Sequence, residues 1–233
     1  AAVKVIERLG LQERVDLQSF ELSALLRVHA TAPRIRTVAL FADLPGLNLE
    51  PSAQKLAGMQ WPYRSTWSTV PPRVRPSGGF EALGLSPDGG LFAMLEKPLL
   101  DAGHQVEVWR FDAADRRFSH GFDYPLHPRA VAAADLQRLA GEWVVLERDD
   151  TQGDPAGFKR VFAATPQPFS KRELVDLNGL DGFTFPFWTI ESALPLPGGL
   201  LAVANDNNYP FSCGRYVDAG APDDTELIVI QLR

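Results

Sequence analysis

The pattern of hydrophobic and polar positions changes about one third of the way along the chain. In the first part, Val3, Ile6 and Leu9 recur at helical spacing, and Gly10 follows as a helix stop. The whole stretch predicts helix, strand, helix and strand over residues 3–9, 14–20, 21–29 and 35–41. Two strands joined by one helix in so few residues favour a parallel crossover unit, which needs further structure to cover its sheet.

The next stretch, residues 46–77, has no periodicity and is rich in proline. Such a composition is typical of a linker or of extended chain. Its aromatic residues Trp61, Tyr63 and Trp67 favour a segment that packs on a surface.

From Phe80 onward the pattern is that of β-strands, and it repeats. Each copy has a glycine, five mostly apolar residues and two polar residues, over 90–97, 141–148 and 199–206. The three glycines are 51 and 58 residues apart. Each copy is preceded by an apolar strand, over 80–85, 130–134 and 189–194. Each is followed by a more alternating strand, over 105–111, 158–163 and 226–232.

A repeat of about 40–50 residues with up to four strands is typical of a β-propeller blade. The fourth strands of the first two copies are expected over 116–124 and 172–177, whereas the third copy is one strand short. Residues 35–41 or 61–70 are candidate donors of the missing strand. The predicted fold is therefore mainly β: a partial or small β-propeller of four-stranded antiparallel blades, preceded by a short α/β segment.

Polar pairs follow the central strand of each copy: Glu96/Lys97, Glu147/Arg148 and Asn205/Asp206. Because equivalent strand ends of a propeller meet at one channel, we expect these pairs to converge. The chain extends the set by four residues: Asp149, Asp150, Asn207 and Asn208. Glu81 and Glu191 lie in matching contexts near the starts of their strands (GFEAL and TIESA). A Glu inside an apolar strand needs a partner, since an unpaired buried charge is costly.

Clustered carboxylates, amide oxygens and carbonyls suit calcium, which takes about six to eight oxygen ligands. The predicted ligands are Glu81, Glu147, Asp149, Glu191, Asn205 and Asp206. Such an ion would neutralise the acids and hold an anionic substrate, with further positive charge from Arg148, Lys97 and Arg215. The predicted catalytic residues are Glu81, Glu147 and Glu191. The alternative is structural: each Glu pairs with a neighbouring Lys or Arg, and the Asn residues cap turns.

Composition narrows the function. The chain is 45% apolar and 22% charged, so it can bury a core, and its net charge of −6 without a basic stripe argues against nucleic acid as a partner. No apolar run is long enough to predict a membrane span. The single cysteine, Cys213, excludes an internal disulfide. No serine elbow, HExxH, phosphate-loop or dinucleotide motif occurs. The stretch 205–215 (NDNNYPFSCGR) is either a site loop or an elaborate turn.

Four blocks, over residues 79–99, 144–150, 185–215 and 223–233, occur in an order that resembles the phytase-like family described as having esterase-like activity of phytase. The resemblance covers about residues 78–233. It implies a β-propeller, a periplasmic or secreted location, and a small anionic ester as substrate. The resemblance also implies calcium chemistry, because β-propeller phytases use calcium ions to hold and hydrolyse phosphate monoesters.

Residues 7–44, with Gln18, Ser19 and Phe20 at a strand end, resemble the late part of a glycerophosphodiester phosphodiesterase barrel. The barrel's catalytic and metal motifs are absent from this stretch, so the resemblance lends no catalytic residue. It implies three regions: the end of a barrel over 1–45, a linker over 46–77 and phytase-like blades over 78–233. The chain starts Ala-Ala rather than Met, and we expect the rest of a longer parent chain as its partner.

Two functions follow from the sequence. The first is a metal-assisted hydrolase of phosphate or carboxylic esters. The second is a non-catalytic propeller that binds ligands for an attached phosphodiesterase.

Overall fold

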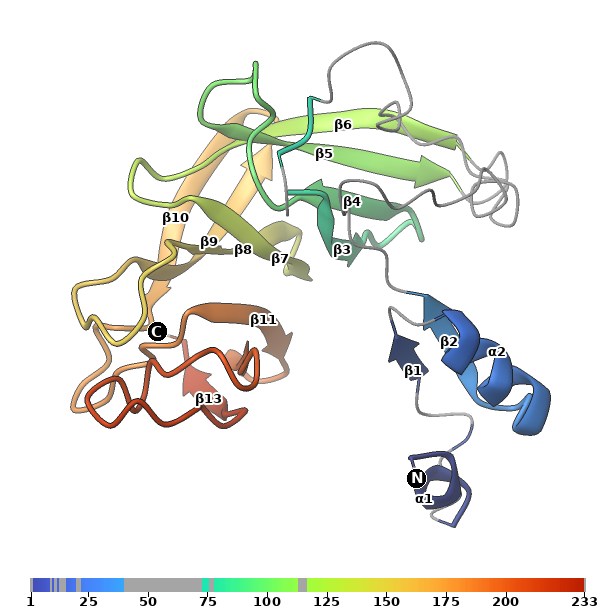
Figure 1. Ribbon diagram of the computed structural model, residues 1–233. Helices are drawn as coiled ribbons and strands as arrows, with labels where there is room; N and C mark the ends of the chain where they lie inside the picture. Colours follow the sequence, from blue (N-terminus) through green and yellow to red (C-terminus); the bar gives the residue numbers. More distant parts are fainter. Residues whose placement is uncertain are drawn as a thin grey trace. The chain divides into compact units, whose positions relative to one another are not determined.

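The computed structural model describes the backbone of residues 2–8, 10, 12, 16–19, 22–39, 73–75, 78–112 and 117–232 (Figure 1). The chain divides into two compact units, Ala1–Leu49 and Glu50–Arg233, and each is described by itself. Most of the predicted linker, including the candidate strand over 61–70, lies outside the described residues.

The first unit is the crossover that the periodicity predicts. Its elements are α1 (Ala2–Arg8), β1 (Asp16–Ser19), α2 (Leu22–Thr31) and β2 (Arg36–Ala39). The strands β1 and β2 pair in parallel, with Asp16 opposite Arg36, and α2 packs on both. Ile6, Ala32 and Ile35 form its small buried core. The predicted strand over 35–41 thus has β1 as its neighbour within this unit.

The second unit contains three consecutive antiparallel sheets (Figure 1). The first has the order β3-β4-β5-β6, with β3 (Phe80–Leu85), β4 (Leu91–Leu95), β5 (Gln105–Asp112) and β6 (Arg117–Pro125). The second runs through β7 (Ala132–Leu139), β8 (Glu142–Arg148), β9 (Lys159–Pro166) and β10 (Phe169–Asp176). The third holds β11 (Thr189–Leu196), β12 (Leu200–Asp206) and β13 (Leu227–Gln231).

The sheets are arranged as propeller blades. The first strand of each sheet is the innermost one, because β7 contacts both β3 and β11. One hydrophobic core fills the space between the first and second sheets, and another lies between the second and third. Gly84 marks a close approach of the first two blades: a Cβ there would lie 2.7 Å from the Trp143 ring and 2.8 Å from the Leu136 carbonyl oxygen. A side chain at this position would push the first two blades apart.

The strand order confirms the predicted fold. Each copy of the repeat forms the second strand of its sheet, and the third sheet has three strands among the described residues where the others have four. The main shifts are that β7 extends to Leu139, beyond the predicted 130–134, and that β10 starts at Phe169. No helix among the described residues is long and apolar enough to cross a membrane.

Candidate functional site: an acidic pocket at the inner strands

A β-bulge occurs at the same place in every inner strand. The register against the second strand shifts between Phe80 and Ala82 in the first blade. It shifts likewise between Ala133 and Asp135 in the second, and between Ile190 and Ser192 in the third. The residues at the three bulges are Glu81, Ala134 and Glu191. A bulge re-aims its side chain, and all three residues line one pocket.

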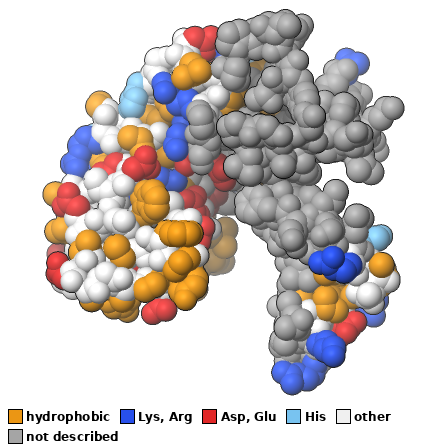
Figure 2. Space-filling model, in the orientation of Figure 1, with side chains coloured by type: hydrophobic (Ala, Val, Ile, Leu, Met, Phe, Trp, Pro, Cys, Tyr) orange, Lys and Arg blue, Asp and Glu red, His pale blue; other side chains and the backbone are white. Residues whose placement is uncertain are grey.

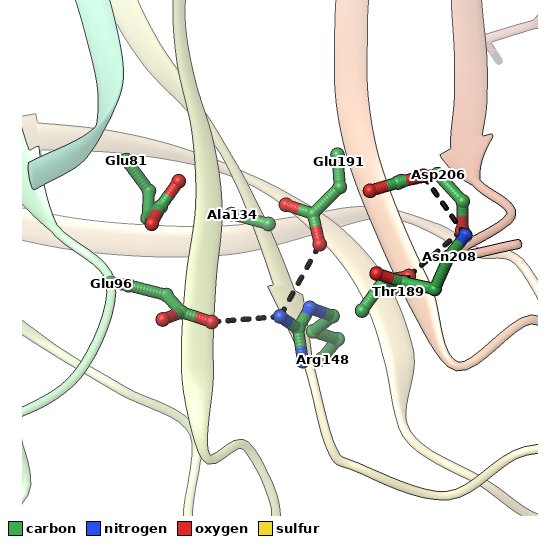
Figure 3. Close-up of a pocket in the computed structure, with 8 residues that line it drawn as sticks. All are labelled: Glu81, Glu96, Ala134, Arg148, Thr189, Glu191, Asp206 and Asn208. Carbon is green, nitrogen blue, oxygen red and sulfur yellow. Dashed lines mark hydrogen bonds and ion pairs between the residues drawn. The ribbon is translucent and has the colours of Figure 1, made fainter. Parts of the chain in front are cut away.

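This pocket has a volume of about 330 Å³. Its lining comes from all three blades: Glu81, Glu96, Ala134, Arg148, Thr189, Glu191, Asp206 and Asn208 (Figure 3). The guanidinium of Arg148 lies between two of the acids, with its Nη2 2.7 Å from Glu96 Oε1 and 3.3 Å from Glu191 Oε1. Arg148 Nη1 contacts Asp150 at 2.9 Å. Arg148 therefore ties the first, second and third blades together.

Negative charge exceeds positive charge in the pocket. Four carboxylates line it against the single guanidinium of Arg148. Burial raises the pKa of Glu191 to about 7, an effect that Arg148 opposes and that Glu96, Glu81 and Asp206 reinforce. Burial likewise raises the pKa values of Glu81 and Glu96 above their ordinary range. A carboxyl group that exchanges its proton near neutral pH is suited to general acid–base chemistry.

The pocket also contains a polar atom that lacks a hydrogen-bond partner. Glu96 is 4% exposed, and its Oε1 is occupied by Arg148, but its Oε2 accepts no hydrogen bond from the described residues. The Nζ of Lys97 lies 3.9 Å from Oε2. Buried polar atoms are usually paired, so this unpaired oxygen adds to the cost of burying the Glu96 carboxylate.

The pocket wall formed by the third blade is held by hydrogen bonds around Asp206. The amide of Asn208 donates to Asp206 Oδ1 at 3.0 Å, and the Asn208 side chain donates to the Thr189 hydroxyl. That hydroxyl donates in turn to the Asp206 carbonyl oxygen at 2.8 Å. The start of the NDNNYPFSCGR stretch is thus fixed to the end of β12 and the beginning of β11 (Figure 3).

Glu147, predicted as a catalytic and metal-binding residue, lies elsewhere. It is fully buried on the face of β8 opposite to Arg148. Its oxygens accept hydrogen bonds from the Tyr124 hydroxyl at 2.6 Å and the His127 amide at 2.8 Å, and they pair with the ammonium of Lys171. Glu147 lies outside the pocket because successive residues of a strand point to opposite faces, and Arg148 is the one that faces the pocket.

Asp149 and Asn205, predicted as metal ligands, also have structural partners outside the pocket. Asp149 accepts a hydrogen bond from the buried Lys159 at 2.9 Å and from the Phe158 amide at 2.8 Å. Burial raises the pKa of Asp149, but these and further hydrogen bonds outweigh it, so the pKa is lowered. Asn205 accepts from the Glu226 amide at 2.7 Å and donates to the Asp224 carbonyl at 3.1 Å. Both residues hold loops against strand ends.

Arg215, predicted to bind substrate, is paired within its own loop. Its guanidinium makes two hydrogen bonds to Glu226, at 3.0 and 2.7 Å, and one to the Thr184 carbonyl oxygen. The buried Asp223 accepts from its amide at 2.8 Å. Lys97 does not line the pocket, but its ammonium lies 3.9 Å from the pocket residue Glu96. The structure therefore brings together Glu81, Glu191, Arg148 and Asp206 of the predicted residues, with Glu96.

The calcium ion that the sequence predicts requires a cluster of oxygen ligands. Carboxylate and amide oxygens are suitable ligands. Within the described ranges, however, no group of three or more His, Cys, Asp or Glu side chains is gathered closely enough to hold a metal ion. The guanidinium of Arg148 lies where a cation shared by Glu96 and Glu191 would have to sit. The arrangement as described does not fit calcium, and the calcium site stays a prediction.

These features define a class of protein: a partial β-propeller with an acidic pocket at the bulges of its inner strands. The chain belongs to the phytase-like family described as having esterase-like activity of phytase, whose family model matches residues 19–209. The match begins well before residue 78, where the sequence resemblance was placed, and it overlaps the stretch compared above with a phosphodiesterase barrel. No comparison supports that barrel resemblance, which stays a prediction.

No curated protein matches the chain. Among solved structures, it is similar to the GH43 endo-arabinanase from Bacillus licheniformis, with 11% identity, a TM-score of 0.38 and coverage of 65% of this chain and 52% of that one. It is similar to an α-L-arabinofuranosidase from Clostridium thermocellum, with 12% identity, a TM-score of 0.39 and coverage of 70% of this chain and 59% of that one. It is also similar to the Bacillus subtilis arabinanase Arb43A, with 12% identity, a TM-score of 0.38 and coverage of 70% of this chain and 57% of that one. The chain spans little more than half the length of these structures.

Proposed function

We propose that this chain carries the active site of an ester hydrolase and that Glu191 is its general acid–base group. The observation that carries the proposal is the pocket itself, in which burial and three neighbouring carboxylates hold the pKa of Glu191 at about 7. The family description, esterase-like activity of phytase, supports the same reaction class.

The reaction is the addition of water across an ester bond. Glu191 as a carboxylate takes a proton from the attacking water, whose oxygen bonds to the ester's electrophilic centre. The protonated Glu191 then gives this proton to the oxygen of the departing alcohol, so an acid and an alcohol are released. Arg148 acts as a positioning residue, because its contacts with Glu96 and Glu191 hold both carboxylates at the pocket.

The test is the hydrolysis of p-nitrophenyl acetate by the whole chain and by Glu191→Gln. The amide keeps the size of the side chain but cannot exchange a proton, so we expect kcat/KM to fall by about 100-fold or more. In the unmodified chain kcat/KM should rise with pH through about 7, as Glu191 loses its proton, and the variant should lack this limb. The matched control is Glu142→Gln, which removes only a surface ion pair with Arg172 and should retain activity.

A Glu191→Gln variant with more than one third of the original activity would refute this role. The same assay with added calcium or a chelator tests the metal. We expect no change, since the described side chains do not gather around a metal position. Calcium-dependent turnover would instead restore the metal-assisted mechanism that the sequence predicts. Ligand binding without turnover in either condition would favour the non-catalytic module.

A further inference from the structure

Two aromatic side chains that follow the pocket residue Asn208 in the chain are highly exposed. Tyr209 is 72% exposed and Phe211 is 76% exposed, the highest values among the exposed large hydrophobic side chains of the described residues. In the space-filling view, several hydrophobic side chains are gathered over the part of the second unit that Figure 1 colours orange to red, from β11 to the C-terminus (Figure 2). Exposed aromatic groups of this size indicate a contact surface.

Hydrogen bonds fix the turn that carries these rings to the pocket wall. Asn208 lines the pocket, and Tyr209 follows it directly in the chain. The Tyr209 amide donates to Asn207 Oδ1 at 3.2 Å, and the Phe211 amide donates to the Asn208 carbonyl oxygen at 2.8 Å. Asn208 itself is bonded to Asp206 and Thr189 in the pocket wall of the third blade. The turn that carries the two rings is therefore tied to the pocket wall, and the rings follow Asn208 by one and three residues in the chain.

The charge of the pocket selects against anions. Four carboxylates against one guanidinium repel a phosphate group, and Arg148 already has Glu96, Glu191 and Asp150 as partners. This excess of negative charge disfavours the small anionic ester predicted from the sequence, and an uncharged ester avoids the repulsion.

We propose that Tyr209 and Phe211 form an aromatic rim that binds the apolar acyl group of an uncharged carboxylic ester, and that this rim sets the substrate preference of the site. The inference rests on the proposed hydrolase function. In the reaction, water adds to the acyl carbon, the bond from that carbon to the alcohol oxygen breaks, and the carboxylic acid and the alcohol leave. The rim takes part only by removing acyl methylenes from water.

The experiment compares kcat/KM for p-nitrophenyl acetate, butyrate and hexanoate, with p-nitrophenyl phosphate as the anionic probe. The rim should raise kcat/KM about two- to fourfold for each added methylene that it covers. Tyr209→Ala/Phe211→Ala should flatten this series, because the added methylenes then stay in water. Tyr209→Phe keeps the ring and should keep the series. Leu85→Ala, which removes a 65% exposed side chain at the far end of β3, is the control.

A series that stays steep in the double variant, or phosphate as the preferred substrate, would overturn the rim. A separate measurement, calorimetric titration with the uncleavable amide butyranilide, distinguishes the two proposals. If no ester is cleaved but butyranilide binds and the double variant abolishes binding, the rim stands and the hydrolase falls. If Glu191→Gln loses activity while the double variant matches the unmodified chain, the hydrolase stands and the rim falls.

Discussion

Glu147 and Glu191 are both held within the blades, and their surroundings differ in how charge is matched. Glu147 is fully buried and has the Tyr124 hydroxyl, the His127 amide and the ammonium of Lys171 as partners. Glu191 shares one guanidinium with Glu96 and lies near further carboxylates, and its pKa is raised to about 7. Matched acids of the first kind stabilise a fold, whereas an excess of acids is costly and is typical of functional sites.

The largest effect expected from this comparison is the loss of the matched acid. Glu147→Ala leaves the Lys171 ammonium and the Tyr124 hydroxyl without their acceptor inside the protein. We expect the free energy of unfolding to fall by about 3–5 kcal/mol, measured by urea denaturation, because a buried charge is left unpaired.

Glu173→Ala is the matched control, since it removes a carboxylate from an exposed pair with Arg160 at 2.8 Å. Its effect should stay within about 0.5–1 kcal/mol. If Glu147→Ala were equally mild, the buried cluster would not be structural, and the contrast with the pocket would fail.

The same two residues show how much of the site the sequence could predict. The repeat identified the blades, the short third sheet and the strand ends at which Arg148 and Asp206 reach the pocket. It placed both members of each polar pair together, although alternation along a strand sends Glu147 and Asn205 to other surroundings. Which member faces inward depends on the face that the neighbouring blade covers, and local spacing does not reveal this.

The bulges and the distant partners were beyond sequence reasoning for a related reason. The matching contexts of Glu81 and Glu191 were visible, but the equivalent position in the second blade is Ala134, which no chemical pattern marks. The partners of Glu147 come from strands far along the chain, Tyr124 on β6 and Lys171 on β10. Non-local pairing decides whether an acid is matched or left in excess.

The second prediction removes the cation of the pocket. Arg148→Met takes away the charge that opposes the rise in the pKa values of Glu191 and Glu96, so the pKa of Glu191 should move above about 7. At pH 8 the unneutralised carboxylates should lower the free energy of unfolding by about 2–3 kcal/mol, and the loss should be smaller at pH 5. Carboxyl ¹³C chemical shifts measured against pH report the titration directly. An unchanged Glu191 titration would show that Arg148 does not set the pKa of Glu191.

The smallest effect is the pH dependence of stability that Glu191 itself contributes. Its pKa is raised from 4.5 to about 7 on folding, so the folded chain holds a proton that the unfolded chain has released between these values. The stability from this proton is fully present below about pH 4.5 and is lost as the pH rises through about 7. The stability that this proton contributes is therefore absent at high pH.

Glu191→Gln mimics the protonated group. The free energy of unfolding of the variant should therefore match that of the unmodified chain near pH 4.5 and exceed it by about 1 kcal/mol at pH 8, a figure reduced for partial exposure. Urea denaturation at a series of pH values measures the difference, with Glu173→Gln as the exposed control. Parallel curves for the two chains would mean that Glu191 is not held under excess negative charge, and the pocket would then resemble the matched Glu147 cluster.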